Sequence, residues 1–102
     1  MPTPSSFIAV VGQGSTSYVQ GTVGVGTSEM EAKVGSARLS NRASLAIHNI
    51  SSNTVYFGPS GVTTTTGSPL EKGERYWTDD ANLAIYLIAG SASNRVVIEE
   101  KN

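Results

Sequence analysis

Short apolar stretches separated by glycine, serine, asparagine and proline run through most of this chain of 102 residues. Such pulses, rich in β-branched and aromatic residues, are typical of short β-strands joined by turns. We expect strands at residues 7–11, 17–25, 44–50, 54–57, 74–78, 84–88 and 95–99. About seven or eight strands in so short a chain predict an all-β fold, either a single antiparallel β-sandwich or a jelly roll, with an extended N-terminal segment.

Residues 27–34 allow two interpretations. The spacing of Ser28 and Glu31 fits a helix capping box. Strict alternation of apolar and charged residues instead favours a strand, and we prefer it. In that strand the inward residues are apolar and the outward residues are charged, namely Met30, Ala32 and Val34 against Glu29, Glu31 and Lys33.

Alternation within the expected strands also predicts the core. Each of four strands places two apolar residues on one face, which are Leu45 and Ile47, Val55 and Phe57, Ile85 and Leu87, and Val96 and Ile98. The opposite faces carry Tyr56, Tyr86, Ile88 and Val97. A strand facing only water usually carries less apolar surface, and cover by a neighbouring subunit is one explanation.

Three turns have a predictable chemistry. Residues 51–53 join two apolar pulses and predict a tight hairpin, because asparagine tolerates a left-handed backbone. Gly73 closes a turn after Leu70 and is expected to have a positive φ. The four threonines at 63–66 fit either a strand extension or a hydroxyl-rich loop.

Length and composition indicate one domain, a sandwich over residues 16–102 preceded by an arm or edge strand at 1–15. Seven scattered Lys and Arg residues against eight Asp and Glu argue against a nucleic-acid partner. Cysteine is absent, so cytosolic synthesis is the simplest expectation. No stretch approaches the roughly 20 apolar residues of a membrane-spanning helix, and the N-terminus lacks a basic signal-peptide region, so we expect no membrane association.

Residues that carry chemistry are few. His48 is the only histidine, and no cysteine is present to complete a metal site, so we expect a structural role for it. Asp79, Asp80 and Asn82 match no ordered calcium loop. The Gly-x-Gly pairs at 12–14 and 24–26 lack the rest of a dinucleotide fingerprint, and no Gly-x-Ser-x-Gly elbow occurs. We therefore expect no catalytic residue, no cofactor and no metal.

The long loop at residues 58–69 is more easily explained by contact with a partner than by core building. The neighbouring Tyr76 and Trp77 are suited to a protein interface or a sugar ring. Because they alternate, only one of them is expected to be free for recognition. Phe7 and Ile8 lie in a segment suited to adding a strand to a sheet edge, or to forming the first strand of the sandwich itself.

One long stretch carries a resemblance. Residues 38–74, RLSNRASLAIHNISSNTVYFGPSGVTTTTGSPLEKGE, with AIYLIAG at 84–90 and RVVIEE at 95–100, look like a small β-sandwich module of tailed-bacteriophage virion proteins. In that family an "Arg, small, Leu, x, Ile, x, Asn" strand leads into "Val-Tyr-x-Gly". A "Gly-Val-Thr" loop ending in "Gly-x-Pro-Leu" and a "Gly-Glu" turn follow. The likeness covers about half of the chain. It departs at His48, where many relatives carry another polar residue.

The resemblance implies a non-enzymatic structural protein of a virion, assembled in the host cytoplasm. A capsid decoration or cement protein fits best, binding the major capsid protein or another virion protein as a homo-oligomer, with a trimer favoured. The alternative is a structural or glycan-binding receptor module of the tail, neck or fibre. The expected contact residues are Phe7, Ile8, Tyr56, Pro59, Val62, Thr64, Tyr76, Trp77 and Tyr86.

Overall fold

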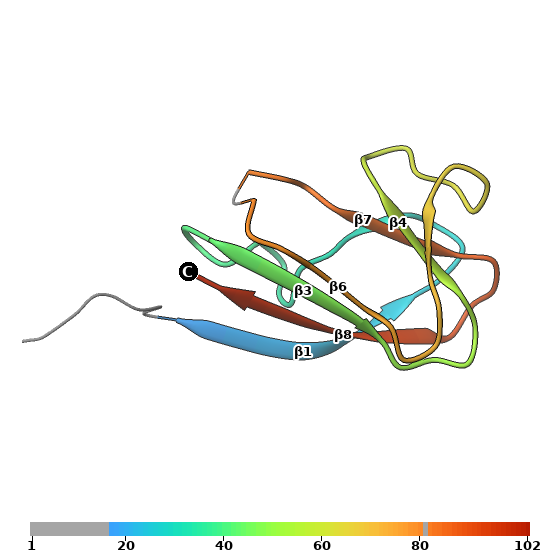
Figure 1. Cartoon of the computed structure of the whole chain (residues 1–102), viewed down its shortest axis with the longest axis horizontal. Helices are drawn as coiled ribbons and strands as arrows, with labels where there is room; N and C mark the ends of the chain where they lie inside the picture. The colour runs from blue at the N-terminus through green and yellow to red at the C-terminus, as the bar shows by residue number, and fades with distance from the viewer. Residues whose placement is uncertain (1–16, 81) are drawn as a thin grey trace, which may run out of the picture.

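A computed structural model describes residues 17–80 and 82–102, and in this part of the chain eight strands form two antiparallel sheets with no helix (Figure 1). The expectation of an all-β fold is confirmed. The strands are β1 (Tyr18–Val25), β2 (Met30–Glu31), β3 (Ser44–Asn49), β4 (Val55–Gly58), β5 (Ser68–Leu70), β6 (Arg75–Thr78), β7 (Tyr86–Ala89) and β8 (Asn94–Lys101).

Each sheet has four strands. Sheet A has the order β1-β8-β3-β6, and sheet B has the order β2-β7-β4-β5. The chain passes from one sheet to the other at every connection except the one between β4 and β5. This is the strand order of an eight-stranded jelly roll, one of the two architectures that the sequence predicts.

The turn at 51–53 differs from its prediction. We expected a tight hairpin, but β3 belongs to sheet A and β4 to sheet B, so the turn is an arch between the sheets. The buried Asn49 shapes this arch. Its Oδ1 accepts hydrogen bonds from the amide and hydroxyl of Ser51, at 2.9 and 2.7 Å. Its Nδ2 donates to the carbonyls of Asn53 and Leu70. These bonds satisfy the side chain and bend the backbone out of sheet A.

The core lies between the sheets and largely follows the predicted alternation. Seven of the eight residues predicted as core pairs are buried there, and the eighth, Phe57, is partly buried and packs against them. The buried apolar cluster consists of Val25, Ala32, Leu45, Ile47, Val55, Leu70, Ile85, Leu87, Ala89, Val96 and Ile98.

Of residues 27–34 none forms a helix, but the preferred strand is confirmed only at Met30 and Glu31, which pair with β7 as β2. Ala32 is fully buried, and Met30 and Val34 pack against the core, which confirms their inward direction. Gly73 has a φ of 84°, so its predicted positive φ is confirmed.

A buried ion pair joins the two sheets at one end of the sandwich. Arg42 Nη1 lies 2.8 Å from Glu100 Oε2, and both side chains are almost fully buried. The guanidinium also donates to the carbonyls of Ala32 and Leu83, which flank strands of sheet B. Because each charge is paired and hydrogen-bonded, burial is tolerated here, and the pair fixes how the ends of the sheets meet.

Candidate functional site

The expected contact residues lie in different parts of the sandwich. Phe7 and Ile8 fall outside the described residues. Trp77 lies on the outer face of sheet A, whereas Tyr56 and Tyr86 lie on the outer face of sheet B. Pro59, Val62 and Thr64 belong to the loop between β4 and β5. The described residues therefore offer two separate surfaces.

Tyr76 and Trp77 point in opposite directions, as the alternation predicts. The Tyr76 ring packs against the core, with its centroid 4.4 Å from that of Phe57. Trp77 is 59% exposed on the outer face of sheet A. Only Trp77 is therefore available to a partner. It also points away from sheet B and its threonine loop, so these residues do not form one combined sugar site.

The outer face of sheet A spans all four strands. One row across it contains Gln20, Glu99, Ala46 and Trp77 in successive strands. Tyr18, 54% exposed, lies at the β1 margin of this face, and Trp77 lies at the β6 margin. The sequence suggested apolar surface here only through Val97, which is half-buried. The face is instead a mixed surface with an exposed aromatic ring at each margin, a composition common at protein interfaces.

Tyr18 is held in place by its neighbours. Its hydroxyl donates to Gln20 Oε1 at 2.9 Å, and Lys101 Nζ lies 5.4 Å from the centre of the ring. Desolvation and then the charge of Glu99 raise the pKa of the Tyr18 phenol. The hydroxyl is therefore a neutral hydrogen-bond donor at physiological pH.

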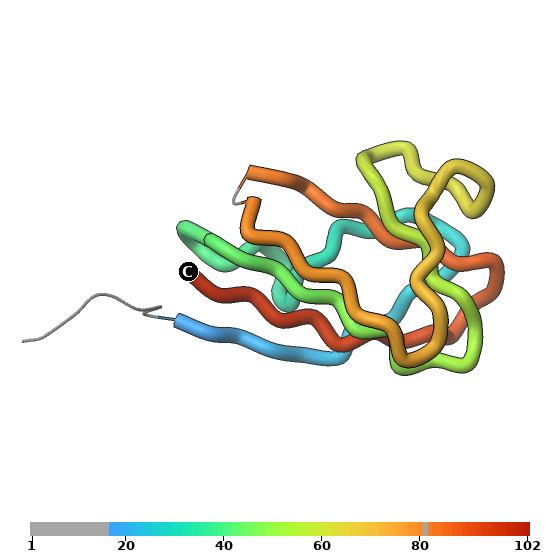
Figure 2. The backbone as a smooth tube through the Cα atoms, in the orientation of Figure 1, coloured from blue at the N-terminus to red at the C-terminus, as the bar shows by residue number. Residues whose placement is uncertain are grey.

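The loop between β4 and β5, traced in yellow in Figure 2, lies at the end of sheet B where it joins these two strands. Its anchor is Val62, which is buried beside two glycines. A Cβ atom on Gly58 would lie 3.0 Å from Val62 Cγ2, and one on Gly67 would lie 2.8 Å from the same atom. The absence of side chains at these two positions creates the space for Val62. Val62, a predicted contact residue, is therefore buried against other residues of the same chain.

Hydrogen bonds hold the rest of this loop. The Gly61 amide donates to Glu29 Oε1 at 2.8 Å, which ties the loop to the β1–β2 connection. Thr63 Oγ1 accepts from the amides of Thr65 and Thr66, and the Thr63 amide donates to Thr66 Oγ1. The tract is thus the hydroxyl-rich loop, one of the two predicted alternatives. Two predicted contact residues of the loop, Pro59 and Thr64, are exposed.

Tyr56 and Tyr86 are half-buried on the outer face of sheet B. A Cβ atom on Gly67 would lie 2.8 Å from Tyr56 Cβ, so the loop backbone packs directly on this tyrosine. Tyr86 pairs in register with Gly58, the glycine whose Cβ position faces Val62. Part of the apolar surplus in the sequence, at Tyr56, therefore has a partner within the chain.

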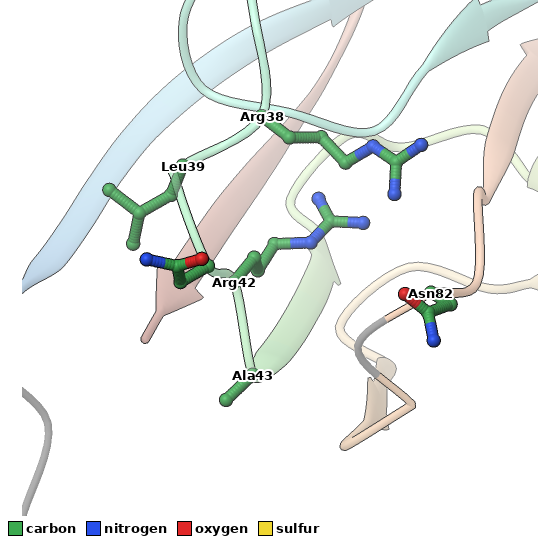
Figure 3. A pocket seen from close by; sticks show the side chains of 6 residues that line it. Arg38, Leu39, Arg42, Ala43 and Asn82 are labelled. Carbon is green, nitrogen blue, oxygen red and sulfur yellow. The ribbon is translucent and has the colours of Figure 1, made fainter.

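A hollow of about 500 Å³ opens at the end of the sandwich that holds the buried ion pair. It is lined by Arg38, Leu39, Asn41, Arg42, Ala43 and Asn82. Figure 3 shows both arginine side chains extending in the same direction, toward the side where Asn82 lies. The hollow therefore combines two cationic groups with polar side chains.

The two cations already have carboxylate partners. Glu100 neutralises Arg42, and Arg38 Nε lies 2.7 Å from Glu31 Oε2. The second contact is a charge contact rather than an aligned hydrogen bond, since this buried Oε2 atom has no hydrogen-bond partner among the described residues. Because local carboxylates balance both charges, the hollow lacks the uncompensated charge that would favour an anionic ligand.

The other candidate groups remain apart. His48 is half-buried in sheet A, in register with Val97 and Arg75. Asp80 Oδ1 accepts from the Asn82 amide in a local turn. Over residues 17–80 and 82–102, no group of three His, Cys, Asp or Glu side chains is arranged to hold a metal ion.

Sequence reasoning missed two features. One is the Arg42–Glu100 pair, whose partners are 58 positions apart and carry no local signal. The other is the position of β1 at the margin of sheet A. Its complete lack of charge was visible in the sequence, but its edge position depends on the topology.

Comparison of the chain with models of known protein families, with curated proteins and with solved structures gave no match. Within the described residues, no helix has the length and apolar character needed to cross a membrane.

Proposed function

We propose that the chain is a non-enzymatic structural protein of a bacteriophage virion, specifically a capsid decoration protein. In this role it binds the outer shell and bridges neighbouring capsid subunits. The action is burial of surface, with no bond made or broken. The partner is the major capsid protein or another virion protein.

One observation carries this proposal: the residues behind the family resemblance occupy positions with special structural demands. Arg42 forms the buried ion pair, Asn49 shapes the arch, and Val62 fills the space beside Gly58 and Gly67. A similarity made only of common strand residues would not extend to such positions. The likeness therefore concerns determinants of the fold, which supports kinship with the virion module.

The architecture adds weaker support by analogy. Jelly rolls occur in viral capsid domains and in lectins, so the fold suits both the proposal and its alternative. A shell-binding protein also needs exposed surface that its own chain does not cover. The outer face of sheet A and the exposed loop residues Pro59 and Thr64 meet this requirement.

The test is the position and copy number of the chain in purified virus particles, measured by cryo-electron microscopy and quantitative gels. The proposal predicts many copies distributed over the outer shell at symmetry-related sites. A few copies confined to the tail or portal vertex would contradict it and favour a tail or neck component.

A glycan-binding role is the second candidate, and the exposure of Trp77 favours it because an open indole ring can stack on a sugar. A glycan array probed with the purified chain tests this role. Trp77→Ser should abolish binding, whereas Thr65→Ala, a change at an exposed loop position, should preserve it. The absence of any glycan signal would exclude this role.

A further inference from the structure

The four margins of the two sheets are protected very unequally. In sheet B, β2 has only two residues, and β5 has three with Pro69 in the middle. In sheet A, β6 has four residues, carries Arg75 and is followed by two aspartates. Short length, proline and charge are the usual devices that prevent a sheet edge from pairing with another chain.

β1 has none of these devices. It lies at the other margin of sheet A, where Figure 1 draws it in blue beside β8, and its eight residues include no charge and no proline. Among the described residues it pairs with β8 alone. An uncharged edge of this length is a template for a further strand.

The backbone groups that face away from β8 can be identified. The Asn102 amide donates to the Ser17 carbonyl, which starts a ladder in which odd-numbered residues of β1 bond to β8. Tyr18, Gln20, Thr22 and Gly24 therefore direct their N–H and C=O groups outward, and all four residues are exposed. Each copy of the chain thus presents four donors and four acceptors along one edge.

We propose that this edge pairs with β1 of a second copy, antiparallel about a two-fold axis at Gly21. In this full-overlap register Gln20 lies opposite Thr22 of the second copy, and Tyr18 lies opposite Gly24. Two copies then form eight hydrogen bonds, because each supplies four outward donors. A shift by two residues in either direction leaves one outward residue of each β1 without a partner in the other β1.

The side chains complement one another in the same register. On the outer face the Tyr18 ring covers Gly24 of the second copy, where no side chain stands in the way. On the inner face Val19 lies opposite Val23 of the second copy, so an apolar pair extends the core side of the sheet. Because β1 is uncharged, self-pairing brings no like charges together. Sheet A becomes one continuous eight-stranded sheet.

This inference does not rest on the proposed function. It also differs from the trimer that the family resemblance implies, because a two-fold contact closes with two copies. The interface is narrow, so the dimer is expected to form with rising protein concentration. Analytical ultracentrifugation of the full chain from micromolar to millimolar concentration should detect it.

Two double variants test the register. Gln20→Lys with Thr22→Lys places lysines opposite each other at two sites and should raise the dimer dissociation constant by about tenfold or more. Gln20→Lys with Thr22→Glu places Lys opposite Glu at both sites and should restore association. A register shifted by two residues would instead put Lys opposite Lys or Glu opposite Glu. Thermal melting verifies that each variant is folded.

A third variant covers the case in which the lysine pair prevents folding. Thr22→Pro removes one outward donor without touching the ladder to β8, so it should weaken the dimer at little cost to the fold. A chain that stays monomeric at millimolar concentration would overturn the proposal. So would association that the Lys–Lys variant and Thr22→Pro leave unchanged, or that the Lys–Glu variant fails to restore. Loss of association only in the full chain with Phe7→Ser and Ile8→Ser would assign it to the N-terminal segment instead.

Discussion

The chain's own loop packs on part of the outer face of sheet B, whereas no other described residues cover the outer face of sheet A between Tyr18 on β1 and Trp77 on β6. Sheet B carries the larger apolar surplus in the sequence, yet Val62 and the backbone at Gly67 satisfy part of it. Sheet A carries less apolar surface but keeps an exposed aromatic ring at each margin. Exposed interaction surface therefore depends on which face the loops cover, and not on apolar content alone.

The two margins of sheet A extend the comparison. β6 is short and flanked by charge, whereas β1 is long and uncharged. Among residues 17–80 and 82–102 each of these strands pairs on one side only, and β1, with eight residues against four, offers more outward backbone groups. The proposed interaction side is therefore sheet A, with β1 as its long uncharged edge.

Loss of the link between the sheets should have the largest effect. Arg42→Met leaves the Glu100 carboxylate buried without its partner, so the free energy of unfolding should fall by about 3–5 kcal/mol. Chemical denaturation measures this change. Adding Glu100→Gln to the variant removes the unpaired charge and should recover part of the loss. If both proteins lose the same stability, the ion pair is not the link between the sheets.

Disturbing the packing of the β4–β5 loop at Gly67 should have the next largest effect on stability. A Cβ atom at Gly67 would lie 2.9 Å from the Thr63 carbonyl oxygen and 2.8 Å from Tyr56 Cβ. Gly67→Ala should therefore cost about 1–3 kcal/mol of unfolding free energy through overpacking. Gly90→Ala is the matched control, because a Cβ atom there meets nothing within 4 Å, and its stability should be unchanged. Equal effects at the two glycines would refute the packed-loop description.

Truncation of Val62 tests the packing of the same loop. Val62→Ala deletes two buried methyl groups and should lower the unfolding free energy by about 1–2 kcal/mol. Thr64→Ala, at an exposed position of the same loop, should stay near the wild-type value. A Val62→Ala protein with unchanged thermal stability would instead mean that Val62 is available to a partner.

The open face should tolerate change best. Trp77→Ser removes an exposed side chain that the core does not require, so stability should stay within about 0.5 kcal/mol of the wild type. The informative measurement is binding, where this variant should lose affinity for capsid shells if the proposed function is correct. A large loss of stability would show that Trp77 supports the fold.

Periodicity predicted most of the sandwich because inward residues such as Ile47 and Ile98 follow the two-residue repeat of a strand. It did not predict the arch at 51–53, because Asn49 acts through distant carbonyls such as that of Leu70. A hairpin and an arch have the same local sequence signal. The topology decides between them.

The candidate site was less predictable than the fold. The alternation of Tyr76 and Trp77 correctly gave one inward and one outward ring. Val62 was expected to contact a partner because a glycine-rich loop suggests an exposed segment. The two glycines instead make room for Val62 to pack inward. This role of the glycines can be recognised only from the structure, where Gly58 and Gly67 both lie against Val62.

The most direct test of sheet A as the interaction side is residue-resolved amide hydrogen exchange by NMR at low and high protein concentration. At low concentration the amides of Tyr18, Gln20, Thr22 and Gly24 should exchange rapidly, while those of the odd-numbered residues of β1 are protected. At high concentration these four amides should become protected, and the amides of β6 should not change. Protection that appears elsewhere while the four β1 amides still exchange rapidly would contradict the account.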